Sequence, residues 1–571
     1  MKTLGATLRN RWHVGQRFLR TTLARGGRDG HIEHVDRPVR EGTLLSPAAQ
    51  SAASPFATAL QWCCATSLIV FGPLALASLL LWVLCGGALW DCVPVWHDEG
   101  WYWNEMAVYE SVGWDGGYTV IHEWPARAEW VRFGTHGPFV PALYGTLARA
   151  FGLHYASIPL LNAGMLVAAS LFWVACCRPS TRQAWVTAFI VLTFWPLVLY
   201  VPTSMQEVMH LAIAFVVAAW MVLLIRSPGN RWLLAGGLIA VALAAQLRVT
   251  WAFVAVPLVW VAWRPANWRQ WTALAAASGM FVGLLYVEAI MLYSPYPNFM
   301  KDVLDRAGQS PAAACGMVVV HVLKSIVRYL APNHDTFVQI GFRYQTLMVV
   351  GAAIYFFRRR RLLPQTAGNA NASGMTVTGS APTGTAPAVL APVAFGVMLL
   401  TLFTIVGFII AFYDVFNWRD YRVVAPHFLL ALLVLVACGA RDWLGGYAVV
   451  SVLLAALALP QFAEFHRPRV EFDTARVAAF SEQVGQVVKY LPNGSGWDNT
   501  LLMDIDVLDS PLLMGLPRGI GISVSRYWNL QAWPPRSKYL LLDRQRAAQM
   551  GIPSTFEKVA ETELGDIYAR R

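Results

Sequence analysis

The sequence predicts an α-helical polytopic membrane protein with about eleven transmembrane helices, one re-entrant or interfacial segment and a small C-terminal α/β domain. Three observations predict this fold class. The chain has 571 residues, of which 56% are apolar and only 13% charged. Its apolar runs are continuous and reach the roughly 20 residues that cross a bilayer, which favours helices over alternating barrel strands. Beyond residue 460 the composition becomes balanced in charge.

Eleven runs with few or no charges are the predicted spans, and basic connectors separate several of them. The N-terminal tail carries nine Lys and Arg before residue 60, and RRRR stands at 358–361. Basic segments stay on the cytoplasmic side of a membrane. The N-terminus is therefore expected in the cytoplasm. The runs are 67–90, 156–177, 184–201, 206–225, 232–247, 249–263, 271–293, 336–357, 391–413, 423–440 and 443–460.

A shorter apolar segment, GPFVPALYGTLARAFG at 137–152, tests this topology. Counting it as a span would reverse every later loop and put the basic connectors outside. We therefore expect it to be re-entrant or to lie in the interface. The loop 91–155, residues 294–335, the segment 413–422 and the C-terminal part then face outward.

This topology divides the chain into three parts. A basic cytoplasmic tail covers 1–60, a transmembrane domain covers 61–460, and a periplasmic or extracellular α/β domain covers 461–571. The Gly-, Ala-, Ser- and Thr-rich stretch within 358–390 predicts a flexible cytoplasmic linker. In the last domain the residue pattern predicts a helix at 474–491 and strands at 500–503, 520–525 and 538–543.

Several function classes are disfavoured by composition. The net charge of +11 collects in the tail and the short loops, as membrane topology requires, so it does not predict nucleic-acid binding. No Gly-rich phosphate loop opens a helix after a strand, so no nucleotide site is predicted. The eight cysteines lack metal-binding spacing, and a disulfide between Cys92 and Cys315 is left open.

The loop 91–155 holds eight acidic residues against three arginines, and it begins with WHDEGWYWNEM at 96–106. Asp98 and Glu99 stand a few residues after a predicted span, at the depth of lipid headgroups. A carboxylate there can accept a proton from an attacking hydroxyl or hold a bound group. Aromatic residues such as Tyr102 can stack on a sugar face. The alternative is that these residues only anchor the loop in the interface.

His136 stands where the non-spanning segment 137–152 begins, and further polar residues fall at the predicted outer ends of later spans. Arginine binds phosphate through several N–H donors of its planar guanidinium group. An ionisable residue at membrane depth is a functional candidate. The alternative for His136 is a purely structural role, and the alternative for the arginines is that their side chains extend from a helix end to the membrane interface. The candidates are His136, Glu207, Arg248, Arg419 and Arg422.

These motifs resemble the GT-C-fold glycosyltransferases, in particular the superfamily of protein O-mannosyltransferases and lipid A aminoarabinose transferases. The resemblance rests on Asp98–Glu99 followed by Tyr102, on His-Gly-Pro at 136–138, on the glycine-rich span leading to Arg248, and on Arg-x-x-x-Pro at 422–426. It covers most of residues 67–460. Gly100 and Trp101 depart from the small residues common in relatives, which bears on how an acceptor fits.

The resemblance implies a transferase that moves a sugar from a polyprenyl-phosphate donor to a glycan, lipid or protein acceptor, usually with inversion, at the outer face of a bacterial inner membrane. It implies that Asp98 is the base or acceptor-orienting group, with Glu99 as its partner. Arg248 and Arg422, with Arg419 as a weaker match, would hold the donor phosphate; His136, Tyr102 and Glu207 would contact substrate. Some members use a divalent metal and others do not, so a cofactor is left open.

Two other functions remain open from the sequence. A multi-pass transporter or flippase of a lipid-linked or small polar substrate would place charges deep inside spans and often shows inverted repeats. Most of the spans here are uncharged, and no internal repeat is visible. A membrane scaffold whose C-terminal domain binds a partner would leave the outer charges scattered.

Overall fold

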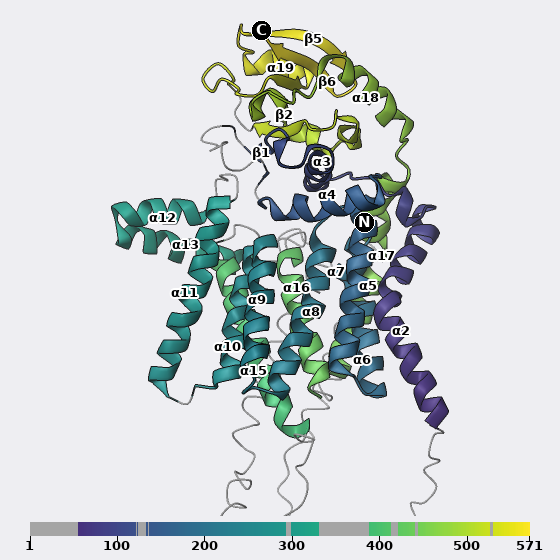
Figure 1. The fold of residues 1–571 in the computed structure, drawn as a ribbon, viewed down its shortest axis with the longest axis vertical. Helices are drawn as coiled ribbons and strands as arrows, with labels where there is room; N and C mark the ends of the chain where they lie inside the picture. Colours follow the sequence, from purple (N-terminus) through teal and green to yellow (C-terminus); the bar gives the residue numbers. More distant parts are fainter. Residues whose placement is uncertain are drawn as a thin grey trace, which may run out of the picture. The chain divides into compact units, whose positions relative to one another are not determined.

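Helices form most of the chain, and a mixed sheet lies near its C-terminus (Figure 1). The structure is a computed structural model, and residues 55–571 form one compact unit. The residues that it describes are 55–121, 123, 133–134, 136–265, 267–292, 299–330, 387–412, 421–439, 444–525 and 529–571.

Helix α8 (Glu207–Arg226) is central to the helical region. It packs against α5 (Ser157–Cys177), α9 (Arg231–Leu247) and α16 (Tyr421–Ala437), and these helices run side by side in Figure 1. Between His210 and Arg226 its side chains are apolar around the whole circumference, as expected for a helix surrounded by other helices. The remaining helices of this region are α2 (Pro55–Leu80), α6 (Thr181–Thr193), α7 (Trp195–Tyr200), α10 (Ala255–Trp263), α11 (Trp268–Leu292), α12 (Phe299–Gln309), α13 (Pro311–Leu330), α15 (Pro387–Phe412) and α17 (Leu444–Val470).

Four helical stretches in the described part of the chain are long and apolar enough to cross a membrane. They are Phe56–Cys85, Ser157–Cys177, Glu207–Arg226 and Trp268–Glu288. Shorter apolar helices accompany them, among them α9, α10 and α16. This composition is compatible with an integral membrane protein.

The predicted apolar runs fall on helices wherever the structure describes them; the run 336–357 lies outside the described residues. Several boundaries differ from the prediction. The predicted run 184–201 is divided between α6 and α7 at Phe194, and α2 begins at Pro55 rather than at residue 67. The first helical stretch ends at Cys85, where Gly86 adopts a left-handed conformation (φ 74°), rather than at residue 90. Helix α17 continues to Val470, ten residues beyond the predicted end, because His466 and Arg469 find buried partners on other elements.

Helix α4 (Phe139–Phe151) occupies the segment that the sequence excludes from the spans. Its 13 residues correspond to about 20 Å, which is shorter than the roughly 30 Å of a bilayer core. It packs along α3 (His97–Val112), where Gly145 lets the two helices approach: a Cβ there would lie 2.6 Å from the ring of Tyr109.

The sheet has six strands in the order β1-β3-β2-β4-β6-β5. The helix and strands predicted for the C-terminal domain are present as α18, β2, β3 and β4; the hairpin of β5 and β6 was not predicted. Strands β1 to β4 are parallel, whereas β6 is antiparallel to both its neighbours. The elements are β1 (Val120–Ile121), α18 (Ala475–Val487), β2 (Thr500–Asp504), β3 (Gly521–Ser525), β4 (Tyr539–Leu542), α19 (Arg544–Met550), β5 (Phe556–Thr562) and β6 (Gly565–Arg570).

Strand β1 belongs to the loop 91–155, about 400 positions away from the strand that it pairs with. Val120 aligns with Ser523 and Ile121 with Val524. Three further contacts hold this segment on the sheet. Thr500 Oγ1 accepts the N–H of Tyr118, and Asn104 donates to the carbonyl of Ile520. Glu123 accepts the N–H and the hydroxyl of Ser537. The first long loop and the C-terminal domain therefore fold as one body.

Candidate functional site

The beginning of α3 is fixed by the buried carboxylate of Glu99. It accepts the N–H groups of Val95 and Trp96, both at 3.1 Å, which satisfies free donors at the helix start. It also accepts the N–H of Ser204 at 2.8 Å, from the turn before α8, and pairs with Arg469 at the end of α17. Both members of this ion pair are inaccessible to solvent. Glu99 thus joins three elements, and its oxygen atoms are already occupied.

Asp98 is the neighbouring residue but points to a different partner. Its Oδ2 lies 2.7 Å from Nη2 of Arg422, the second residue of α16, and the side chain is 25% exposed. Burial raises the pKa of Asp98, but the charges of Arg422 and His97 and the hydrogen bond from Arg422 together hold it below its usual value. Asp98 is therefore an accessible carboxylate that is ionised at neutral pH.

Two arginines share the carboxylate of Glu207, the first residue of α8. Arg248 Nη2, at the C-terminal end of α9, lies 2.9 Å from its Oε1, and Arg422 Nε lies 3.8 Å from the same atom. The Arg422 guanidinium also faces the ring of Trp96 at 5.0 Å. Asp98, Arg422, Glu207 and Arg248 form a continuous chain of alternating charges, which we call the charge cluster.

His136 and Tyr102 lie beside the charge cluster. Tyr102 Oη and His136 Nε2 are hydrogen-bonded at 2.8 Å. Burial and the charge of Arg248 lower the pKa of His136 to about 4, although Asp98 and Glu207 act in the opposite direction. Burial raises the pKa of Tyr102 well above its usual value, with Asp98 and Glu207 adding to the effect. At neutral pH both groups are uncharged.

His97 lies at the outer edge of the charge cluster, toward the C-terminal domain. Its ring nitrogens lie 3.4 Å from Asp98 and 3.2 Å from Asp509. The hydrogen bond to Asp509 raises the pKa of His97, against the effect of burial, and Asp98 adds to the increase. A residue of the C-terminal domain is thus linked through one imidazole to Asp98.

Glu105 was not singled out by the sequence, yet it is the second buried acid of α3. Its Oε1 accepts the indole N–H of Trp101 at 2.9 Å and the N–H of Gly134 at 2.7 Å. Burial raises the pKa of Glu105 to about 7, although both hydrogen bonds lower it. The sequence could have indicated this contact, because Trp101 and Glu105 are four residues apart and side chains at that spacing meet on a helix.

The structure brings most of the predicted site residues together. Asp98, Glu207, Arg248 and Arg422 form the charge cluster, and Tyr102 and His136 border it, whereas Arg419 lies outside the described residues. Arg469, which the sequence did not indicate, pairs with Glu99. Among the described residues no group of three or more His, Cys, Asp or Glu side chains could hold a metal ion. Cys92 and Cys315 are free thiols.

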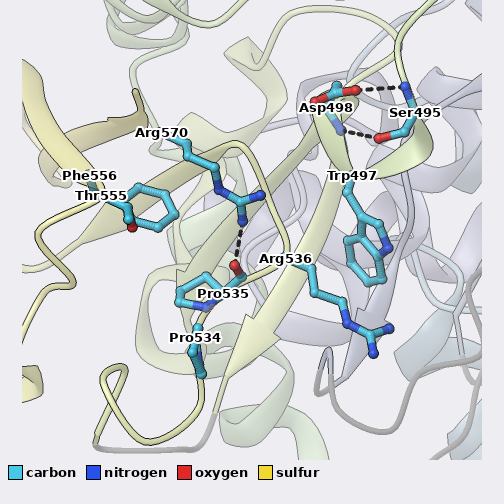
Figure 2. A pocket seen from close by; sticks show the side chains of 9 residues that line it. All are labelled: Ser495, Trp497, Asp498, Pro534, Pro535, Arg536, Thr555, Phe556 and Arg570. Carbon is cyan, nitrogen blue, oxygen red and sulfur yellow. Dashed lines mark hydrogen bonds between the residues drawn. The ribbon is translucent and has the colours of Figure 1, made fainter.

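A separate hollow of about 500 Å³ lies in the C-terminal domain. Figure 2 shows Trp497 and Arg536 on one side and Arg570 beside Pro535 on the other. Arg570 donates to the carbonyls of Pro535 and Ser537, so its guanidinium holds the wall of the hollow. None of the charge-cluster residues lines it.

No protein-family model, curated protein or solved structure matches this chain. The geometry of the charge cluster and the sequence motifs therefore provide the evidence for its function.

Proposed function

We propose that this protein is a membrane glycosyltransferase that moves a sugar from a polyprenyl-phosphate donor to a glycan, lipid or protein acceptor. The observation that carries the proposal is the position of Asp98. This partly exposed, ionised carboxylate lies 2.7 Å from Arg422, which shares Glu207 with Arg248. Group transfer from a phosphate leaving group needs a proton acceptor and cations within the same site. The charge cluster supplies both.

In the proposed reaction an acceptor hydroxyl attacks the anomeric carbon of the lipid-linked sugar. The bond between that carbon and the phosphate oxygen breaks, and the polyprenyl phosphate leaves with the electron pair. Asp98 receives the hydroxyl proton or orients the hydroxyl. Arg248 and Arg422 hold the negative charge on the phosphate, as planar guanidinium groups do well. Glu99, with its oxygens occupied, positions Asp98 by fixing the start of α3.

The alternative of a transporter is less well supported by the position of the charges. Glu207 and Arg422 stand at the first turns of α8 and α16, and Arg248 stands at the end of α9. Charges on a translocation path are expected near the middle of the spans instead. Because the starts of α8 and α16 and the end of α9 meet in one charge cluster, a reaction at a membrane face is favoured. We propose that this is the outer face, with eleven spans, a cytoplasmic N-terminus and the C-terminal domain outside.

Replacing one carboxylate tests the proposal. The purified full-length chain in lipid nanodiscs is given radiolabelled polyprenyl-phosphate monosaccharides and an envelope glycan extract, and the label transferred to the extract is counted. Asp98→Asn keeps the shape but removes the proton acceptor, and we expect a loss of at least 100-fold in transfer while fold and expression stay intact. Asp91→Asn is the matched control, because Asp91 is an exposed carboxylate of the same loop that only caps the N–H of Ala88. Equal transfer by wild type and Asp98→Asn would overturn the role of Asp98.

A comparison of cells with and without this protein identifies the product. Mass spectrometry of the envelope glycans, lipids and proteins should reveal a single sugar missing from one component when the protein is deleted. An unchanged set of components, together with an altered distribution of a lipid-linked sugar between the two membrane leaflets, would favour the transporter.

A further inference from the structure

Next to the charge cluster, the turn before α8 and the first turn of α8 present polar atoms that have no partner in the described part of the chain. They include both amide atoms of Gln206, the hydroxyl of Ser204 and Nε2 of His210. All three side chains are at most 1% exposed. Gln206 and His210 are four residues apart, and Glu207 and His210 three, so these groups share one side of the helix.

Trp251 and His427 lie next to His210. Trp251 donates its indole N–H to Nδ1 of His210 at 3.2 Å and lies 4.4 Å, ring to ring, from His427 of α16. Nδ1 of His427 has no partner within the described residues, and the same holds for Oε2 of Glu207 and Nη1 of Arg248. We call Ser204, Gln206, Glu207, His210, Arg248 and His427 the polar floor.

The chemistry of these atoms restricts what can satisfy them. Since Nδ1 of His210 accepts the Trp251 proton, Nε2 of the neutral ring is a donor. Arg248 Nη1 also only donates, Glu207 Oε2 only accepts, and the amide of Gln206 does both. Buried polar groups are almost always paired, so a ligand with both donors and acceptors is indicated. A phosphate offers acceptors alone, and an ammonium group offers donors alone.

Sugar hydroxyls donate and accept, and one ring carries several of them. We infer that the polar floor binds the hydroxyl groups of the donor sugar and thereby selects which sugar is transferred, with Gln206 and His210 as the specificity-determining residues. This inference rests on the proposed function, because it takes the sugar to be carried on a polyprenyl phosphate held by Arg248 and Arg422.

A site built to pair with hydroxyls should discriminate strongly, because a sugar that lacks or misplaces a hydroxyl leaves buried protein groups unpaired. Gln206 offers a clean test. Neither of its amide atoms has a protein partner in the described part of the chain, so Gln206→Leu removes ligand contacts while keeping the volume. The melting temperature of the ligand-free Gln206→Leu protein should therefore equal or exceed that of wild type.

The experiment measures lipid binding rather than transfer. Dissociation constants are determined for the full-length protein in nanodiscs with unsubstituted polyprenyl phosphate and with polyprenyl-phosphate glucose, galactose, mannose and arabinose. For wild type we expect one sugar lipid to bind at least tenfold more tightly than the unsubstituted lipid. Gln206→Leu and His210→Phe should reduce that gain to twofold or less, with the affinity for unsubstituted lipid unchanged. Ser523→Ala, which removes from β3 a buried hydroxyl with no partner among the described residues, is the control and should keep the full gain.

The outcomes separate the two proposals. A tenfold gain that persists in both Gln206→Leu and His210→Phe would overturn the role of the polar floor and leave the glycosyltransferase proposal intact. If wild type binds the unsubstituted lipid and no sugar increases the affinity, the sugar-binding role of the polar floor is also overturned. Water molecules would then be the partners of its polar atoms. Failure of wild type to bind any of the five lipids would count against the proposed function itself.

Discussion

Glu99 and Arg469 are paired in the interior of the protein, 370 positions apart in the sequence and both fully removed from solvent. The pair joins the start of α3 to the end of α17, and the N–H of Ser204 binds the same carboxylate. Because Asp98 is the next residue, the direction of its side chain depends on this pair.

The first prediction concerns this pair. Removing one partner of a buried ion pair leaves an uncompensated charge, which typically costs about 3–5 kcal/mol. Arg469→Met should therefore lower the free energy of unfolding by that amount, measured by thermal or denaturant unfolding in detergent. Arg467→Met is the control: Arg467 pairs with Glu471 at the surface, where such pairs contribute less than about 1 kcal/mol. Similar losses in the two variants would contradict the structural role of Arg469.

The second prediction concerns Glu105 and pH. The pKa of Glu105 is about 7 in the folded protein, whereas an ordinary glutamate carboxyl has a pKa of 4.5. Between these values the folded state holds a proton that the unfolded state has released, so raising the pH favours unfolding. Glu105 should therefore remove roughly 3 kcal/mol of stability between pH 4.5 and 7. Glu105→Gln, which can still accept from Trp101, should abolish this loss and be more stable than wild type at pH 8. A pH series of melting temperatures measures both effects.

The third prediction is the opposite dependence for His136. Its pKa is about 4 in the folded protein against 6.5 ordinarily, so the unfolded state binds more protons between these values. Raising the pH from 4 to 6.5 should then stabilise the fold by a similar roughly 3 kcal/mol. In wild type the two effects largely cancel. As the pH rises, the stability of His136→Gln should fall because of Glu105, and the stability of Glu105→Gln should rise because of His136. The same dependence of stability on pH in both variants would refute this account.

The fourth prediction concerns the junction of β1 with the sheet. A Cβ at Gly117 would lie 1.7 Å from the carbonyl oxygen of Asn499 and 2.7 Å from the N–H nitrogen of Gly521. Gly117→Ala should therefore separate the loop from the sheet and increase its cleavage by protease. Gly164→Ala is the control, since Gly164 lies within α5 and a Cβ there meets no atom within 4 Å. It should be neutral or stabilising by up to about 1 kcal/mol. Equal protease resistance in both variants would show that the contact is dispensable.

Much of the helical architecture could be predicted, because uncharged runs of the length of a bilayer allow few other structures. The basic connectors also predicted that the segment of α4 does not form a span, and this helix has only 13 residues. Strands β2, β3 and β4 were visible as short runs of β-branched and aliphatic residues between turn signals. The residues of the charge cluster were found because charges at the ends of apolar helices are uncommon.

The long-range pairings could not be predicted. Strand β1 has only two residues, too few to show an alternating pattern, and it exists because β3 offers a parallel edge about 400 positions away. Arg469 resembles the ordinary basic residues that follow a span, and only the fold shows that it is buried against Glu99. Asp98 and Glu99 are adjacent and equally acidic in the sequence, whereas their partners give them different roles. The burial of Glu105, like that of Glu99 and Glu123, is visible only in the fold.

The shared sheet has a consequence for how the protein is made. The ribosome delivers Val120 about 400 residues before its partner Ser523. At 5–20 residues per second, the loop that carries Asp98 waits roughly 20 to 80 s for the strand that completes it. During that time β1 cannot pair and Glu99 lacks Arg469. Asp98 therefore reaches the position described here only after Arg469 and Ser523 have been synthesised.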